Sequence, residues 1–456
     1  MTTISDFINV SARKNVEEAI AKAHQYESFH ALLSINETQA LERADAVDRG
    51  EITGSLAGVP FLAKDNFLTV GGTTTAASKM LENFHAPLQA TAIEKLEAEG
   101  AICIGKANLD SFAHGGSTEN SAYGPTKNAI DQERVAGGSS GGSAVAVALG
   151  IVPFALGTDT GGSIRQPASF NGVVGVKPTY GTVSRYGVVA MASSTDTIGV
   201  LTSNVHDAVL VMAIISGKDT KDMTTLPNFF IPKDLDGKKK IGIIKEALTD
   251  DVDPDVRRVT NEYVEKLRSN GHQVEEVSLP LLRYALAIYY VVVPAEISSN
   301  LGRYDGIRYG TRAEATQLSE LYGLSREQGF MTENKRRIMI GSYVLSSGFF
   351  DAYYLQAQKV RTLLINEFDE LFKQFDVLIT PVAPTPAFKL GELTSDLISM
   401  YLADVMTVPA SLAGLPAISV PAGKDTQGLP IGVQLIGKRR DDALLLALAE
   451  SIEGQL

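Results

Sequence analysis

Three short segments of this sequence bring together hydroxyl nucleophiles, a candidate base and closely spaced glycines. The first surrounds Lys64, the second is a glycine–serine tract at 137–143, and the third, 158–167, places Gly161 and Gly162 directly before Ser163. A serine hydroxyl becomes a strong nucleophile only when a base removes its proton. The combination therefore favours a hydrolase that attacks an acyl group through a serine.

The two glycines before Ser163 predict a site for the charge that develops in such a reaction. They allow a sharp turn with no side chain crowding a substrate. We expect the backbone N–H groups of Thr160, Gly161 and Gly162 to converge there on an oxyanion. Donors of this kind stabilise the tetrahedral intermediate of acyl transfer.

Lys64 is the stronger candidate for the base. Its neighbours Val59, Pro60, Phe61, Leu62 and Phe67 are apolar. Burial among them would lower the pKa of the amine and leave it neutral, able to accept a proton. Two alternatives stay open: Lys64 is an ordinary surface lysine, or the base is His114, the one histidine of six near these segments.

Two other motifs resemble known functional sites, but the residues in or around each motif do not fit that function. The tract contains Gly-x-Ser-x-Gly around Ser139 and Ser140, but a polar stretch, 131–134, precedes it where a nucleophile elbow needs a buried strand. Residues 100–107 nearly match a phosphate-binding loop, yet Ala107 lacks the hydroxyl for magnesium. The single cysteine, Cys103, lies in an apolar run there and is interpreted as a core residue rather than a nucleophile.

Composition limits the class of protein. The chain has 456 residues, of which 44% are hydrophobic and 21% charged, with a formal net charge of −12. That balance disfavours direct nucleic-acid binding over a broad basic surface. We expect no metal site, no transmembrane helix and no secretory signal, and therefore a cytoplasmic protein or one of an equivalent organellar matrix.

Helical and strand patterns alternate at both ends of the chain. We expect helical spacing over 5–48, strands near 59–63, 101–104, 240–244, 273–277, 376–381, 417–421 and 432–436, and helices near 91–99, 140–149, 254–269, 332–374 and 443–452. This alternation predicts an α/β fold with a mixed central sheet covered by helices on both faces. With no linker visible, we expect one domain over 1–456, with an N-terminal helical segment at 1–50 and the catalytic core at 59–200.

The three segments resemble the amidase signature family, whose catalytic set is a serine-serine-lysine triad. Ser139 follows Lys64 by 75 residues and Ser163 follows Ser139 by 24, as in that family. The resemblance implies the family's fold, with Ser163 as nucleophile, Ser139 as proton relay and Lys64 as base. Ser140 and Ser143 would be structural.

Further segments resemble the glutaminase subunits of aspartyl/glutamyl-tRNA amidotransferases: 76–84, 115–120, 303–310, 335–338 and 345–354. Departures are Ala136 and Ala422, where proline and cysteine are common. The resemblance implies hydrolysis of glutamine, with ammonia passing to partner subunits B and C to amidate Glu-tRNA(Gln), Asp-tRNA(Asn) or both. It implies no cofactor in this chain, ATP and magnesium at the partner, and tRNA bound mainly there.

Recognition of free glutamine needs a cation for its α-carboxylate and an anion for its α-ammonium. Arg337 suits the first role, because a guanidinium binds a carboxylate in a bidentate fork, and Asp404 suits the second. Tyr289 would add a hydroxyl contact, and Arg336 and Tyr290 are the alternates in neighbouring positions. The alternative function is a stand-alone amidase acting on other carboxamides, for which Arg337 and Asp404 would be dispensable.

Overall fold

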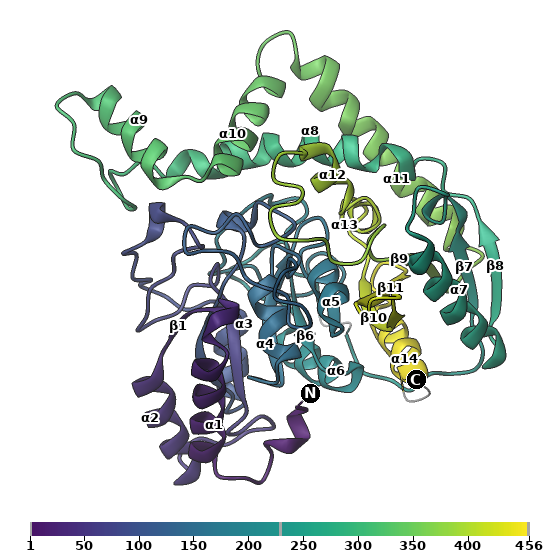
Figure 1. Ribbon diagram of the computed structural model, residues 1–456, viewed down its shortest axis with the longest axis horizontal. Coiled ribbons are helices and arrows are strands. Elements are labelled where there is room, and N and C mark those ends of the chain that lie inside the picture. Colours follow the sequence, from purple (N-terminus) through teal and green to yellow (C-terminus); the bar gives the residue numbers. More distant parts are fainter. Residues whose placement is uncertain (1, 228–229, 454–456) are drawn as a thin grey trace.

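The centre of the computed structural model, which describes residues 2–227 and 230–453, is a mixed β-sheet (Figure 1). Its eleven strands lie in the order β1-β3-β2-β4-β6-β5-β10-β11-β9-β7-β8. Their bounds are β1 (Leu32–Ile35), β2 (Pro60–Lys64), β3 (Ile102–Ala107), β4 (Phe154–Asp159), β5 (Val174–Lys177), β6 (Thr197–Thr202), β7 (Lys240–Ile244), β8 (Gln273–Val277), β9 (Val377–Pro381), β10 (Ala417–Lys424) and β11 (Pro430–Gly437).

Fourteen α-helices surround the sheet within the described residues. They are α1 (Ala12–Gln25), α2 (Glu37–Asp48), α3 (Thr91–Ala98), α4 (Gly141–Ala148), α5 (Arg165–Asn171), α6 (Val205–Ile215), α7 (Pro254–Ser269), α8 (Leu282–Asn300), α9 (Leu318–Gly329), α10 (Thr332–Val344), α11 (Gln356–Leu371), α12 (Leu397–Leu402), α13 (Val408–Leu412) and α14 (Asp442–Glu453). None of them is long and apolar enough to cross a lipid bilayer. Figure 1 shows α8 to α11 lying above the rest of the molecule.

Alternate residues of the central strands point to opposite faces of the sheet, and each face has its own helices. Leu62 of β2 and Ala155 of β4 pack with α1, α2 and α4. Phe61 and Phe154, whose rings stack with centroids 5.3 Å apart, pack on the other face with α3, α6 and α14. The predicted mixed sheet covered on both faces is therefore confirmed.

Strand direction explains why the sheet is mixed. β2 pairs in parallel with β3 and β4, and β7 pairs in parallel with β8 and β9. The two groups are joined by antiparallel strands, of which β5 and β10 form the contact between the halves of the chain, with Ala417 opposite Lys177. Functional groups from residues near 60–165 and near 404–434 are therefore neighbours in space.

Most of the predicted elements are present, with three corrections. The predicted helical segment at 5–48 contains a strand between α1 and α2, because Leu32–Ile35 pairs with β3 and forms the edge strand β1 of the sheet. The predicted helix at 332–374 is interrupted between α10 and α11. The long helix α8 was not predicted, and the proline at position 294 inside it weakens the helical signal.

The structure also bears on the phosphate-loop motif and on Cys103, but not on the domain boundaries. The phosphate-loop resemblance at 100–107 is ruled out, since residues 102–107 form strand β3 rather than a loop of exposed N–H groups. Cys103 is partly exposed as a residue, but its thiol is desolvated. Desolvation raises the pKa of the thiol to about 12, which leaves no thiolate to act as a nucleophile. The domain boundaries 1–456, 1–50 and 59–200 stay predictions, and residues 1 and 454–456 lie outside the described part of the chain.

Gly199 supplies a test of the sheet. A Cβ added to Gly199 on β6 would lie 1.9 Å from the carbonyl oxygen of Val176 on β5. Gly199→Ala should therefore lower the free energy of unfolding by roughly 1–3 kcal/mol, as overpacking does. Gly323→Ala is the matched control, because Gly323 lies inside α9 with nothing near its Cβ position.

Alanine at position 323 should stabilise the helix by about 1 kcal/mol. The two variants should consequently move the urea midpoint in opposite directions. A Gly199→Ala protein as stable as the wild type would contradict the close approach of β5 and β6.

Candidate active site

Lys64 is the last residue of β2 and is completely buried. Its amine lies 2.8 Å from the Ser139 hydroxyl, 2.8 Å from the Ser140 hydroxyl and 2.9 Å from the Thr158 hydroxyl. Burial lowers the pKa of this amine to about 7, although the negative charges of Asp110, Asp159 and Asp196 act to raise it. The surface-lysine alternative is therefore wrong.

The partners of the three hydroxyls distinguish Ser139 from its neighbours. The Ser140 hydroxyl donates to the Thr158 carbonyl at 3.2 Å, so its hydrogen is already used. The Thr158 hydroxyl also accepts from the Asn66 side chain at 3.1 Å. Among the described residues, the only hydrogen-bond partner of the Ser139 hydroxyl is Lys64. Ser139 is therefore the hydroxyl best placed to give a proton to a neutral Lys64 amine.

Ser163 lies beside this group, on the turn between β4 and α5. Its carbonyl accepts a hydrogen bond from the Ser140 backbone N–H at 3.0 Å, and its side chain is 8% exposed. The backbone N–H groups of Gly161, Gly162 and Ser163 have no acceptor among the described residues. The turn thus carries a hydroxyl and unused donors side by side, as an oxyanion site requires.

A buried ion pair holds this turn in place. The Arg165 guanidinium binds Asp159 in a bidentate manner, at 2.8 and 3.0 Å, and both side chains are fully buried. Its other N–H groups donate to the Thr407 carbonyl, the Ser411 hydroxyl and the Gln434 side chain. Sequence reasoning did not find this pair; the only signal was an acid and a base six residues apart on either side of Ser163.

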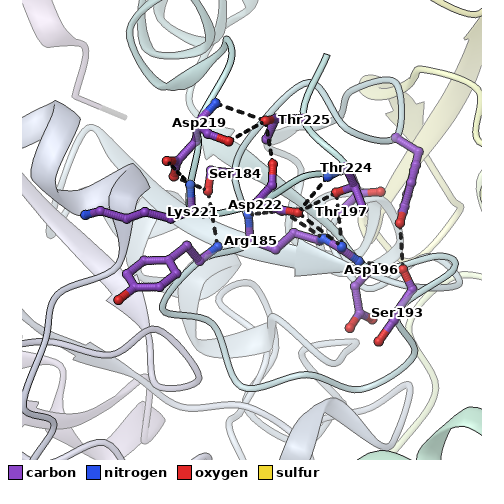
Figure 2. A network of polar contacts seen from close by, with 12 residues as sticks. Ser184, Arg185, Ser193, Asp196, Thr197, Asp219, Lys221, Asp222, Thr224 and Thr225 are labelled. Atoms are coloured by element: carbon purple, nitrogen blue, oxygen red, sulfur yellow. Dashed lines mark hydrogen bonds and ion pairs between the residues drawn. The ribbon is translucent and has the colours of Figure 1, made fainter.

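The Thr160 side chain is fixed on the other side of the turn. Its hydroxyl donates to Asp196 at 2.8 Å. Thr158, Thr160 and Asp196 border a cavity of about 220 Å³ whose wall includes part of the network of polar contacts drawn in Figure 2. There Arg185 binds Asp222, with 3.2 Å between Nε and the carboxylate.

A second cavity, of about 280 Å³, lies where the sequence placed glutamine recognition. Its wall includes His114, Gly116, Tyr290, Arg337, Tyr401 and Asp404. A Cβ at Gly162 would lie 3.4 Å from the Asp404 carboxylate. The cavity therefore adjoins the turn that carries Ser163.

Arg337 is 4% exposed and is not a surface residue. Its guanidinium binds Glu333 at 2.8 Å and lies over the rings of Tyr290 and Tyr401, at 5.3 and 5.9 Å from their centroids. The Tyr401 hydroxyl donates to the same Glu333 carboxylate at 3.0 Å. Glu333 and Tyr401, which sequence reasoning missed, thus orient Arg337 in the cavity wall.

Asp404 faces the cavity without a hydrogen-bond donor to its carboxylate among the described residues. Desolvation raises the pKa of this carboxyl to about 8, and Arg337 opposes the rise. An ammonium group in the cavity would restore the charged form, because an opposite charge nearby favours it. Asp404 is therefore available to bind a cation.

The two alternates, Arg336 and Tyr290, also line this cavity. Arg336 binds Glu333 and its side chain is 33% exposed. Tyr290 stacks on Tyr401 with centroids 4.0 Å apart. Tyr289 instead packs against the turn, since a Cβ at Gly161 would lie 2.8 Å from its ring. The two tyrosines therefore approach the site from different sides.

His114, the alternative base, lies in the wall of the cavity and not beside the serines. Its Nδ1 is 2.8 Å from the Asn334 side-chain nitrogen. No hydrogen bond joins its ring to Ser139 or Ser163. The structure thus gives no support to His114 as the base.

Among the described residues, no group of three or more His, Cys, Asp or Glu side chains is arranged as a metal site.

The fold and this site define the class of protein: the chain belongs to the amidase signature family. A family model described as Amidase matches residues 14–446. The predicted resemblance is therefore confirmed.

Relatives with similar sequences carry the name of one branch of that family. The chain is 51% identical over 455 residues to the A subunit of the glutamyl-tRNA(Gln) amidotransferase from Cyanothece sp., covering 97% of this chain and 94% of the relative. It is 50% identical to the protein of the same name from Lactiplantibacillus plantarum, covering 97% and 93%. The crystal structure of the Thermotoga maritima counterpart superimposes with a TM-score of 0.83 at 41% identity, covering 99% of this chain and 94% of that one.

Lys64 gives a test of the electrostatics of the site. Its pKa falls from 10.5 in the unfolded chain to about 7, a difference equivalent to roughly 5 kcal/mol. Between these values the unfolded chain binds the extra proton, so stability rises with pH. Lys64→Met should therefore stabilise the protein at pH 7, by less than this difference because three hydroxyls lose their partner, and the gain should shrink towards pH 10.

Lys106 on the adjacent strand β3 is the matched control. It is equally buried but lies 3.1 Å from the Asp65 carboxylate. Lys106→Met leaves that carboxylate buried and unpaired, which should cost about 3–5 kcal/mol. Urea unfolding at pH 7 and 9.5 measures both effects, and a Lys64→Met gain that does not depend on pH would contradict the low pKa.

Proposed function

We propose that this chain hydrolyses glutamine to glutamate and ammonia, with Ser163 as nucleophile, Ser139 as proton relay and Lys64 as base. The observation that carries the proposal is the buried Lys64 amine, in contact with Ser139 and close to the Ser163 turn. With a pKa of about 7, half of these amines are neutral near pH 7 and can accept a proton.

The proposed reaction uses these groups in sequence. Lys64 takes the Ser139 proton as Ser139 takes the Ser163 proton, and the Ser163 oxygen attacks the side-chain amide carbon of glutamine. The oxyanion forms beside the free N–H groups of Gly161 and Gly162, next to Thr160. The carbon–nitrogen bond then breaks, and the relay returns the proton to the leaving nitrogen, which departs as ammonia. Water hydrolyses the γ-glutamyl ester by the same relay and restores Ser163.

Residues in the wall of the second cavity select the substrate. Arg337 takes the α-carboxylate and Asp404 the α-ammonium, while Tyr289 packs against the turn at the reacting end. A cation and an anion in the wall of one cavity, with the candidate nucleophile on the adjoining turn, match the three polar groups of glutamine. This pairing favours glutamine over simple carboxamides.

The relatives support a place for this reaction in a larger enzyme. They are named as the A subunits of an amidotransferase that acts on glutamyl-tRNA(Gln). We infer that ammonia passes to partner subunits B and C, where ATP and magnesium activate the misacylated Glu-tRNA(Gln), Asp-tRNA(Asn) or both. The net charge of −12 supports a tRNA site mainly on the partner, and the assembly would be cytoplasmic or in an organellar matrix.

Ser163→Ala should abolish ammonia release from glutamine, because no acyl-enzyme can form. Ser143→Ala is the control: Ser143 is also buried, but its hydroxyl donates to the Leu156 carbonyl and takes no part in the reaction. Ammonia assays with co-expressed partner subunits, together with intact-mass detection of the γ-glutamyl ester, compare the two. Wild-type activity in the Ser163→Ala protein would show that another group is the nucleophile.

Arg337→Met should raise the KM for glutamine about tenfold or more, as loss of a hydrogen bond to a charged group does. Arg336→Met should have a much smaller effect, because Arg336 is more exposed. Steady-state kinetics with glutamine and with a simple amide separate the alternatives. A stand-alone amidase would turn over the simple amide without partners and would tolerate both substitutions.

A further inference from the structure

His114 is the group in this site that the proposed reaction leaves without a role. It is completely buried, it lies in the wall of the cavity that contains Arg337 and Asp404, and its Nε2 has no hydrogen-bond partner among the described residues. Buried polar atoms are rarely left without a partner, and an exception requires an explanation.

The hydrogen bonds of Asn334 fix the protonation of this ring. The Asn334 side-chain oxygen accepts from the Met331 backbone N–H at 3.1 Å, and its nitrogen donates to the Ser111 carbonyl at 2.8 Å. A backbone N–H can only donate and a carbonyl can only accept, so the amide has one orientation. The same nitrogen donates to Nδ1 of His114, which must therefore be the unprotonated ring nitrogen.

The ring proton consequently lies on Nε2. Burial and the nearby Arg337 charge hold the pKa of His114 well below its usual value, so the ring stays neutral. A neutral imidazole with Nδ1 occupied offers one N–H donor. That donor lacks a protein acceptor among the described residues, and it belongs to one of the residues that line the cavity where Arg337 creates a site for an anion.

We propose that His114 is a substrate-binding residue whose Nε2–H donates to the α-carboxylate of the amino acid bound by Arg337. The inference rests on the proposed function and adds a specificity determinant to it. One carboxylate would then accept from a charged guanidinium and from a neutral imidazole. The arrangement favours substrates that carry a carboxylate over carboxamides that lack one.

A matched pair of variants tests this donor. In His114→Asn the short side chain can still accept from Asn334 but cannot reach the Nε2 position. In His114→Gln the longer side chain places an N–H donor near it. The substrates are glutamine and 4-aminobutanamide, which is glutamine without its α-carboxylate, and the full chain is assayed with its partner subunits.

His114→Asn should raise the KM for glutamine about tenfold, with kcat within about twofold, because one hydrogen bond to a charged group is lost from binding. Its kcat/KM for 4-aminobutanamide should not change. His114→Gln should recover most of the glutamine affinity. An unchanged KM for glutamine in His114→Asn, or an equal loss on both amides, would overturn the proposal.

A second measurement does not depend on the folding of the variants. In ¹⁵N spectra of the wild-type protein, the Nε2 signal of His114, assigned by its absence from the His114→Gln protein, should shift when glutamate is added. A signal that glutamate leaves unmoved overturns the role of His114 alone. A wild-type complex that hydrolyses no glutamine would overturn the proposed function and this inference together.

Discussion

The buried ion pair between Asp159 and Arg165 is the interaction on which the site depends. Two charges removed from water are stable only when their partners are nearly complete. Arg165 meets that condition with Asp159 and with acceptors from the segment that contains Thr407, from α13 and from β11. Because the pair spans the turn at 160–164, it holds Ser163 and the free N–H groups in one conformation.

The ion pair also affects Lys64. Asp159 is one of three carboxylates whose charge favours the protonated lysine, and Arg165 neutralises it at close range. Among the described residues, Lys64 contacts hydroxyls and a carbonyl rather than a carboxylate. Desolvation is therefore the largest effect on the pKa of Lys64, and it lowers that pKa. Lys106, on the adjacent strand, differs from Lys64 in that its amine lies 3.1 Å from the carboxylate of Asp65.

The alternation of helical and strand patterns was enough to predict the mixed sheet, and the resemblance to the amidase signature family predicted that Lys64, Ser139 and the Ser163 turn are neighbours. The sequence could not predict the acceptors of Arg165, which lie 242 to 269 residues further along the chain. It could not choose between Tyr289 and Tyr290 either. Successive residues of a helix point about 100° apart, and here one side chain meets the turn and the other the cavity.

The pairing of β5 with β10 has a consequence for synthesis of the protein. The segments that contain Lys64, Ser139 and Ser163 leave the ribosome long before β10 and β11. During that interval the Arg165 guanidinium lacks its distant acceptors, and the turn lacks Thr407, whose hydroxyl donates to the Gly161 carbonyl at 2.6 Å. A nascent chain therefore carries Lys64, Ser139 and Ser163 before the contacts that hold the turn at 160–164 can form.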